Sequence, residues 1–376
     1  MTDEHSSEPE RTSRAPIPWA KPNFWENEER YVADALASTW ISGGPFVDRF
    51  EEALARELDA PFVVAVSNGT TAIHLAYLAL GLGPGDEIIV PGFCFQAAAN
   101  VASLMGATPV FAEIRPDTWC LDPCDLESRI SERTKLIVPV HTYGSVCDMD
   151  AIRTVADAAG VPVLEDAAEA FASSFGGRMA GTMGLMGTLS FQATKTITTG
   201  EGGAVLTSSR ELRDRMHLFR SHGMAEKRYW HEVHGHNFRL TNFQAALGCA
   251  QLEHLDQIVR ERARVKARYE MHLADAAGLE MQTVPEAVDS VLWAMAVRLD
   301  PDAFPQGRDE VMDQLKAKAI ETRVGFYAAS EIPLYGCGPL PVCEAVSGSL
   351  ISLPTFPTLT NDEIDFICDQ LLRLRA

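Results

Sequence analysis

Residues 62–79 read FVVAVSNGTTAIHLAYLA, and this stretch decides the fold. Phe62 to Val66 is a short run of β-branched and aromatic residues, which is typical of a strand, and Ser67 to Thr71 has the composition of a tight turn. From Ala72 to Ala79, apolar residues recur at i, i+3, i+4 and i+7, which predicts an amphipathic helix. A strand, a turn and a helix therefore follow one another directly.

The same unit recurs along the chain. Further strand-like runs lie at 87–90, 109–112, 136–140, 161–165, 189–191 and 204–207, and helices are predicted at 96–105 and 150–159. Strands that alternate with helices indicate a doubly wound α/β fold, with a largely parallel sheet and helices on both faces. Such a sheet binds ligands beyond the carboxyl ends of its strands, so we expect chemistry in the turns that follow them.

The pattern changes after about residue 208. Helices are predicted at 210–219, over 242–268 as one long helix or two, at 308–319 and at 362–372, and a strand is predicted at 291–299. The last third of the chain thus indicates a smaller α+β unit. We predict a disordered tail at 1–18, a large α/β domain at 19–255 and a small α+β domain at 256–376.

Composition excludes several classes of protein. The chain has 376 residues, 46% of them apolar, and a formal net charge of −20. A surface this acidic argues against nonspecific nucleic-acid binding, which depends on basic residues that meet phosphates. No stretch approaches the ~20 uninterrupted apolar residues of a membrane span, and the polar N-terminus lacks the apolar core of a secretory signal.

The eight cysteines do not form a metal-binding pattern. The closest pair, Cys120 and Cys124, is four residues apart, and no set of cysteines and histidines has zinc spacing. We therefore expect no metal site, reduced thiols and a cytoplasmic location.

Two turns could hold an aromatic, phosphorylated ligand. Gly69 and Thr70 begin a helix whose free N–H groups would suit a phosphate, although many strand–helix turns contain glycine and a capping threonine. Phe95 follows the strand that ends at Val90 and could stack on a planar ring, or could be a core residue.

Two further turns carry ionisable groups. Asp166 follows an apolar strand and could pair with a protonated ring nitrogen, or could equally be a helix N-cap. Lys195 lies among small and apolar residues, where desolvation would make its amine a usable nucleophile. A phosphate turn, a stacking aromatic, a carboxylate and a lysine amine are together the parts that a pyridoxal phosphate (PLP) site needs.

These residues are also the ones that carry a family resemblance. From about residue 20 to its end, the chain resembles the sugar aminotransferases of the DegT/DnrJ/EryC1/StrS group, which are PLP enzymes of fold type I. The resemblance is most specific at 67–72, 165–168, 190–203 and 235–252. The segments 165–170 and 221–231 are similar to those of GDP-perosamine synthases and related nucleotide-sugar aminotransferases, whereas 325–330 lacks their His- and Pro-containing segment.

The resemblance assigns roles by position. Residues that would bind PLP are Gly69 and Thr70 at the phosphate, Phe95 on the ring, Asp166 at the ring nitrogen, Glu169 near the ring hydroxyl (where many relatives have Gln), Ser190 at the phosphate, Lys195 as the imine-forming residue, and Asn237, which would reach a neighbouring subunit's phosphate. Residues that would lie near the substrate are Trp40, Ile41, Ser42, Tyr229, Arg239, Phe326 and Tyr327. The resemblance therefore implies a homodimer with shared active sites.

The implied reaction moves an amino group from L-glutamate to a keto-sugar, linked to a nucleotide, with pyridoxamine phosphate as the intermediate form of the cofactor. Three alternatives stay open: a ketocyclitol or other antibiotic-pathway ketone as acceptor, a sugar dehydratase, and a PLP-binding regulator without turnover. Relatives that are dehydratases have His in place of the lysine, so Lys195 argues against the second.

Overall fold

The computed structural model describes residues 15–376, so residues 1–14 of the predicted tail lie outside the described residues. Ile17, also within that predicted tail, is buried and pairs with Ile320 in a parallel bridge. Packed structure therefore begins before the predicted boundary at residue 19. No helix in the described range is long and apolar enough to cross a membrane.

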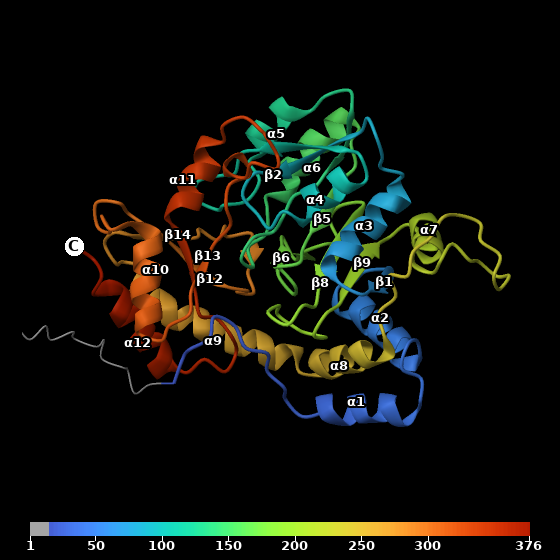
Figure 1. Ribbon diagram of the computed structural model, residues 1–376, viewed down its shortest axis with the longest axis horizontal. Helices are drawn as coiled ribbons and strands as arrows, with labels where there is room; N and C mark the ends of the chain where they lie inside the picture. The colour runs from blue at the N-terminus through green and yellow to red at the C-terminus, as the bar shows by residue number, and fades with distance from the viewer. Residues whose placement is uncertain (1–14) are drawn as a thin grey trace, which may run out of the picture.

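One mixed sheet forms the centre of the larger part of the molecule (Figure 1). Its strands are β1 (Phe62–Val66), β2 (Glu87–Pro91), β3 (Thr108–Ala112), β4 (Thr134–Ile137), β5 (Leu164–Asp166), β8 (Met186–Ser190) and β9 (Gly203–Thr207). They pair in the orders β1-β9-β8-β5 and β3-β2-β4, and parallel bridges from Ile137 to Val163 and from Val140 to Asp166 join the two sets. The pairs from β3 to β8 are parallel, which confirms the predicted largely parallel sheet.

One strand runs against its neighbours. β9 pairs antiparallel with both β1 and β8. The chain reaches β9 from β8 through residues 191–202, which contain no helix. Because a parallel neighbour requires a long crossover, usually helical, this loop instead returns the chain beside β8 in the opposite direction. The same loop contains Lys195.

Helices cover both faces of this sheet. They are α1 (Glu28–Ala37), α2 (Pro45–Glu57), α3 (Gly69–Leu80), α4 (Ala97–Leu104), α5 (Pro123–Arg129), α6 (Met149–Ala159), α7 (Arg210–Arg220) and α8 (Asn242–Glu253). Along β1, Val64 and Val66 face the core that contains α3, α4 and α7, whereas Ala65 faces the core that contains α1, α2, α5, α6 and α8. This alternation follows the two-residue period of a strand and confirms the doubly wound arrangement.

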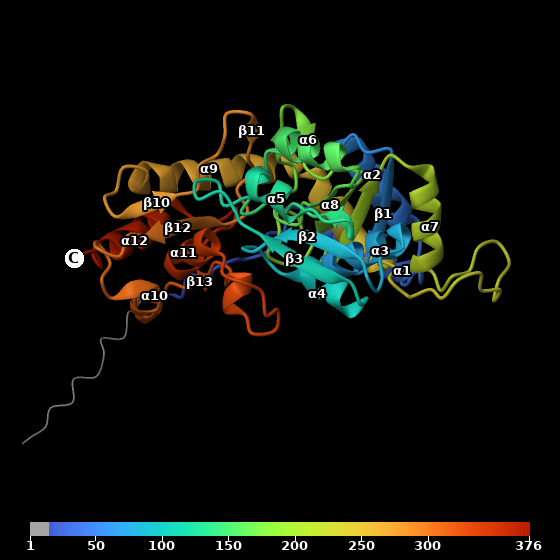
Figure 2. The ribbon, with the colours of Figure 1, turned by 90° about the horizontal axis from the view of Figure 1, so that it is seen from above.

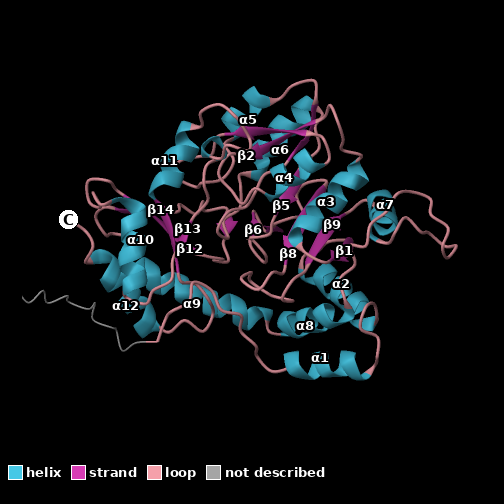
Figure 3. Cartoon of the chain, viewed as in Figure 1, coloured by secondary structure: helices cyan, strands magenta, loops and turns pink. Residues whose placement is uncertain are grey.

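The C-terminal part builds a second, antiparallel sheet at the other end of the molecule (Figures 1 and 3). Its strands pair in the order β10 (Leu279–Met281), β12 (Met295–Leu299), β14 (Leu350–Leu353) and β13 (Arg323–Val324). Its core is closed by α9 (Leu255–Leu273), α10 (Gly307–Ala317) and α12 (Asn361–Leu372). The remaining elements are β6 (Ser174–Phe175), β7 (Arg178–Met179), β11 (Val288–Asp289), α11 (Pro341–Ser349) and a 3-10 turn (Ala329–Glu331). The predicted boundary at 255/256 falls at the start of α9 and stays a prediction.

The structure decides one open alternative and corrects one predicted element. The stretch predicted at 242–268 as one long helix or two is two helices that meet at His254, because α8 packs on the large sheet while Val265, Tyr269 and Leu273 of α9 pack on the C-terminal core. The strand predicted at 291–299 begins only at Met295. Residues 291–294 are buried, but their backbone groups form hydrogen bonds with Arg262, Tyr143 and Ser173 and not with a neighbouring strand.

Candidate active site

A cavity of about 810 Å³ lies at the carboxyl ends of the large sheet's strands, against the C-terminal part. The predicted residues that line it are Gly69, Thr70, Phe95, Asp166, Glu169, Ser190, Lys195 and Phe326. The sheet thus brings together turns that follow β1, β2, β5 and β8, as the position rule for ligands in parallel sheets leads us to expect.

The start of α3 forms one wall of this cavity. The Asn68 side chain accepts a hydrogen bond from Thr71 N at 2.8 Å, and Thr71 Oγ1 accepts one from Asn68 N at 3.0 Å. Within residues 15–376, the N–H groups of Gly69 and Thr70 have no hydrogen-bond partner. A Cβ on Gly69 would lie 2.8 Å from the Ser190 Cβ, so only glycine lets the helix start approach that serine.

Asp166 ends β5 and lies, nearly fully buried, in the cavity wall. Its Oδ1 accepts a hydrogen bond from Ala168 N at 3.1 Å, but no helix begins there, so the alternative of a helix N-cap is wrong. Burial raises the pKa of Asp166, and the Ala168 N–H, the Lys195 amine and His141 oppose that rise.

The neighbouring acid has a different role. Glu165 points to the opposite side of β5, where it accepts hydrogen bonds from the N–H groups of Gly181, Met183 and Gly184. His141 Nε2 lies 3.0 Å from Glu165 Oε2, and both side chains are fully buried. Because His141 Nδ1 accepts a hydrogen bond from a backbone N–H, Nε2 carries a proton and donates to the carboxylate. Glu165 therefore fixes the backbone around β5, while Asp166 faces the cavity.

Lys195 supplies the amine of the site. Its Nζ is 3.8 Å from the centroid of the Trp293 ring and 3.7 Å from Glu169 Oε1. Burial lowers the pKa of Lys195, while Glu169 and Asp166 favour the charged form and oppose that shift. A lowered pKa leaves more of the amine neutral, and hence nucleophilic, at neutral pH.

Aromatic rings form the rest of the wall. Phe95 is 63% exposed and lines the cavity, so the alternative of a core phenylalanine is wrong. Tyr143 stacks between Trp293, at a centroid distance of 6.1 Å, and Phe326, at 5.7 Å. Sequence reasoning missed Tyr143, although it lies in the turn after the strand predicted at 136–140, and it missed Trp293 because this residue falls inside the strand predicted at 291–299.

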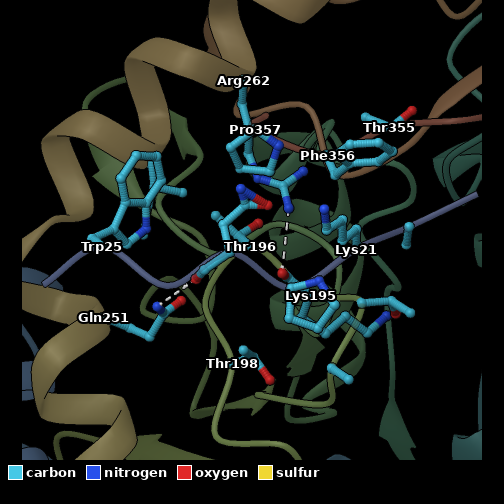
Figure 4. A pocket seen from close by; sticks show the side chains of 16 residues that line it. Lys21, Trp25, Lys195, Thr196, Thr198, Gln251, Arg262, Thr355, Phe356 and Pro357 are labelled. Atoms are coloured by element: carbon cyan, nitrogen blue, oxygen red, sulfur yellow. Dashed lines mark hydrogen bonds between the residues drawn. The ribbon is translucent and has the colours of Figure 1, made fainter. Parts of the chain in front are cut away.

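Arg262 of α9 contacts the loop that carries Lys195 (Figure 4) and also the segment at Leu292 and Trp293. Its Nη1 donates to the carbonyl oxygens of Leu292 and Trp293 at 2.8 and 3.0 Å, and its Nη2 donates to that of Lys195 at 3.3 Å. The Trp293 indole N–H donates to the carbonyl oxygen of Thr194 at 2.9 Å. Burial lowers the pKa of Arg262 to about 10, so the guanidinium stays charged at neutral pH.

We expect Arg262→Met to loosen the Lys195 loop. The change leaves three carbonyl oxygens without a charged donor, each worth about 1.5–3 kcal/mol, so unfolding should become easier by about 3 kcal/mol or more. Urea titration measures this loss, and absorbance of added PLP measures the accompanying loss of cofactor occupancy. Arg260→Met, on the exposed side of the same helix, is the matched control. Equal stability of Arg262→Met and the unchanged protein would show that the contacts are dispensable.

Several predicted residues do not line the cavity. They are Asn237, Trp40, Ile41, Ser42, Tyr229, Arg239 and Tyr327. Trp40 and Arg239 instead line a separate depression of about 570 Å³. Tyr229 is 73% exposed in the loop between α7 and α8, which projects from the body of the molecule in both views (Figures 1 and 2). Asn237 forms a bridge with Ser221 in the same loop.

Comparison with known proteins gives consistent matches along almost the whole chain. Residues 22–372 match the model of the DegT/DnrJ/EryC1/StrS aminotransferase family. The GDP-perosamine synthase of Caulobacter vibrioides is 41% identical over 362 residues, which cover 94% of this chain and 97% of that protein.

Solved structures agree with these matches. The aminotransferase TlmJ from Streptoalloteichus hindustanus has a TM-score of 0.91 at 30% identity, over 96% of this chain and 99% of its own. A Streptococcus pneumoniae protein described as a sugar aminotransferase, solved in its PLP form, has a TM-score of 0.90 at 26% identity, over 96% and 98%. The fold is therefore that of fold-type I PLP enzymes, as the sequence predicts.

Proposed function

The chain belongs to the DegT/DnrJ/EryC1/StrS aminotransferase family, and on this premise we propose that it moves an amino group from L-glutamate to a nucleotide-linked keto-sugar, with PLP as cofactor. One observation carries the proposal: a lysine whose side chain is 14% exposed, a buried carboxylate, and helix-start N–H groups without a partner in residues 15–376 line the same cavity. The similarity to a GDP-perosamine synthase supports a perosamine-type sugar as the acceptor.

The groups in the cavity fit the parts of PLP one by one. The unpaired N–H groups at the start of α3, with the Ser190 hydroxyl, would hold the phosphate. Phe95 would stack on the ring, Asp166 would pair with the protonated ring nitrogen, and Glu169 would lie near the ring hydroxyl. Lys195 would hold the aldehyde carbon covalently. The close approach of Gly69 to Ser190 is the feature that forms the phosphate cradle.

The protein's own groups then perform three tasks. PLP, when bound, supplies an electron sink for the Cα–H bond of the amino donor. Asp166 offers a fixed carboxylate at the floor of the cavity, and the Lys195 amine is placed to take up and return a proton. The rings of Tyr143, Trp293 and Phe326 form an apolar wall beside the amine, which would limit the access of water once the cavity is filled by ligands.

The cavity also has room for an acceptor beyond the cofactor. It continues from the Lys195 amine to Trp19, Arg323 and Ser352 on the C-terminal side, and its volume is that of sites for ligands of drug size. Aromatic walls such as Trp19 and Phe326 suit the apolar faces of a sugar or a nucleobase. These features support an acceptor larger than a simple keto acid.

We further propose that the active unit is a homodimer. Asn237, Trp40 and Tyr229 lie outside the cavity of their own chain, and Trp40 and Tyr229 are 65% and 73% exposed. If a second copy packed against this face, these three residues of the first chain would lie at the cavity of the second. They would complete a site that one chain forms only in part. Sedimentation of the full chain should show a two-copy particle; a fully active monomer would contradict this.

Amine transfer tests the function directly. Full-length protein loaded with PLP, ¹⁵N-labelled L-glutamate and a panel of nucleotide-linked keto-sugars and ketocyclitols should give a ¹⁵N-labelled amino product from at least one keto-sugar, measured by mass spectrometry. Labelling of a ketocyclitol alone would move the acceptor to the other class. A deoxygenated sugar without amine would indicate a dehydratase, and bound PLP without transfer to any acceptor would indicate a regulator.

A further inference from the structure

Glu169 and Lys195 form an acid–base pair in the cavity wall. Glu169 Oε1 lies 3.7 Å from Lys195 Nζ, and the two side chains are 3% and 14% exposed. The other oxygen, Oε2, accepts a hydrogen bond from Tyr143 N at 3.1 Å. One carboxylate oxygen is therefore anchored to the backbone, while the other faces the amine.

The groups around this pair favour a shared proton. Two carboxyl groups, those of Glu169 and Asp166, act on the Lys195 amine, while Glu201 and Arg323 also line the cavity. Burial raises the pKa of Glu169 to about 7, while the Lys195 amine and the Tyr143 N–H oppose that rise. Of the other titratable groups that face the pair, burial keeps the Tyr143 phenol and the Cys94 thiol neutral by raising each pKa.

A further charged group close to the pair is the Arg262 guanidinium. It binds the backbone carbonyl of Lys195 and so lies behind the loop. Two ionised carboxylates beside one ammonium leave a net negative charge in a poorly solvated space, which is costly. Asp166 and Glu169 each accept one backbone N–H, from Ala168 and from Tyr143, but Glu169 has its second oxygen 3.7 Å from the amine, so Glu169 is the acid placed to share a proton with Lys195.

We propose that Glu169 exchanges a proton directly with the Lys195 amine. One proton moves from nitrogen to oxygen, so that ammonium and carboxylate become neutral amine and carboxylic acid, and the reverse transfer restores them. The total charge of the pair does not change. The exchange requires the 3.7 Å gap to close by a side-chain rotation, and catalytic hydrogen bonds are often longer before ligands bind.

The proton exchange between Glu169 and Lys195 rests on the proposed function and adds a proton-transfer step to it. A lysine that must take a proton from the substrate has to become neutral first, and Glu169 accepts the surplus proton without releasing it to water. Glutamine at this position could still accept the Tyr143 N–H, but could not take up a proton. Glu169→Gln therefore separates the anchoring role of the side chain from its acid–base role.

The first test measures how fast the full-length apoprotein binds PLP covalently, by absorbance, across a range of pH. Covalent binding needs the neutral amine. Removal of the neighbouring negative charge lowers the pKa of Lys195, so the pH midpoint of the rate should fall by about one unit or more in Glu169→Gln. Glu87→Gln, a buried acid at the opposite end of β2, is the control and should keep the midpoint.

The second test uses infrared spectroscopy at neutral pH. The unchanged protein should show the C=O stretch of a protonated carboxylic acid that Glu169→Gln lacks. An unchanged pH midpoint, or no such band difference, would overturn the proton exchange while the proposed function stands. Failure of the unchanged protein to bind PLP covalently at any pH would instead overturn the proposed function.

Discussion

With Lys195 replaced by alanine, we expect amino transfer to fall by roughly 10⁴-fold, the upper end of what one positioned proton-transfer group contributes. Its amine is the only lysine nitrogen among the described residues in the cavity, and it lies within 4 Å of both Glu169 and the Trp293 ring. The variant should also lose the absorbance band that covalently held PLP gives, while it keeps part of its affinity for PLP through the phosphate cradle.

Two controls make this result specific. Lys135→Ala removes an exposed lysine at the amino end of β4, the end of the strand opposite to the cavity, and should leave both the band and the transfer rate unchanged. Thermal unfolding should show that Lys195→Ala remains folded. A folded Lys195→Ala protein with full transfer activity would refute the assignment of the amine.

Asp166→Asn should have the second largest effect. The carboxylate is nearly fully buried and acts on the Lys195 amine. Asparagine carries no charge to hold a ring nitrogen protonated, and loss of one fixed electrostatic group of an active site costs roughly 10²- to 10³-fold in rate, about 2.7–4 kcal/mol. Asparagine still accepts the hydrogen bond from Ala168 N, so the local backbone should keep its shape.

The absorbance spectrum of bound PLP separates the loss of the negative charge in Asp166→Asn from a change in the shape of the site. Asp166→Asn should still bind PLP covalently at Lys195. Without a negative charge at the ring nitrogen, amino transfer should remain slow at every concentration of the amino donor. Glu165→Gln, by comparison, changes the acid that faces away from the cavity. It should lower the free energy of unfolding, while the molecules that stay folded should transfer the amino group at a rate close to that of the unchanged protein. Equal rates in Asp166→Asn and the unchanged protein would contradict the role of this carboxylate.

The strand–turn–helix units of the large sheet could be predicted from the sequence because each has a clear local period. The run at Phe62–Val66 and the helix after it appear as β1 and α3, with Gly81 in the left-handed conformation at the helix end. The residues that follow these strands, among them Asp166 and Lys195, then had to meet at one edge of the sheet. The local sequence pattern, together with the rule that ligands bind at the carboxyl ends of parallel strands, was sufficient to predict these elements and residues.

Other features depend on contacts that local patterns do not carry. Residues 291–294 are as apolar as a strand. Arg262 nevertheless donates to the carbonyl oxygens of Leu292 and Trp293, and Trp293 N donates to Tyr143 O, so these residues form a loop. Helices α1, α2 and α5 have no counterpart among the predicted elements. The residues Trp40, Tyr229 and Asn237 came from resemblance alone, and in one chain they lie outside the cavity.

Mapping the point of cofactor attachment tests the central claim most directly. The full-length protein, loaded with PLP and reduced with borohydride, would be digested and its peptides sequenced by mass spectrometry. We expect the pyridoxyl group on a single peptide, at Lys195. A pyridoxyl group on another lysine, or on none, would contradict the assignment of this cavity as the active site.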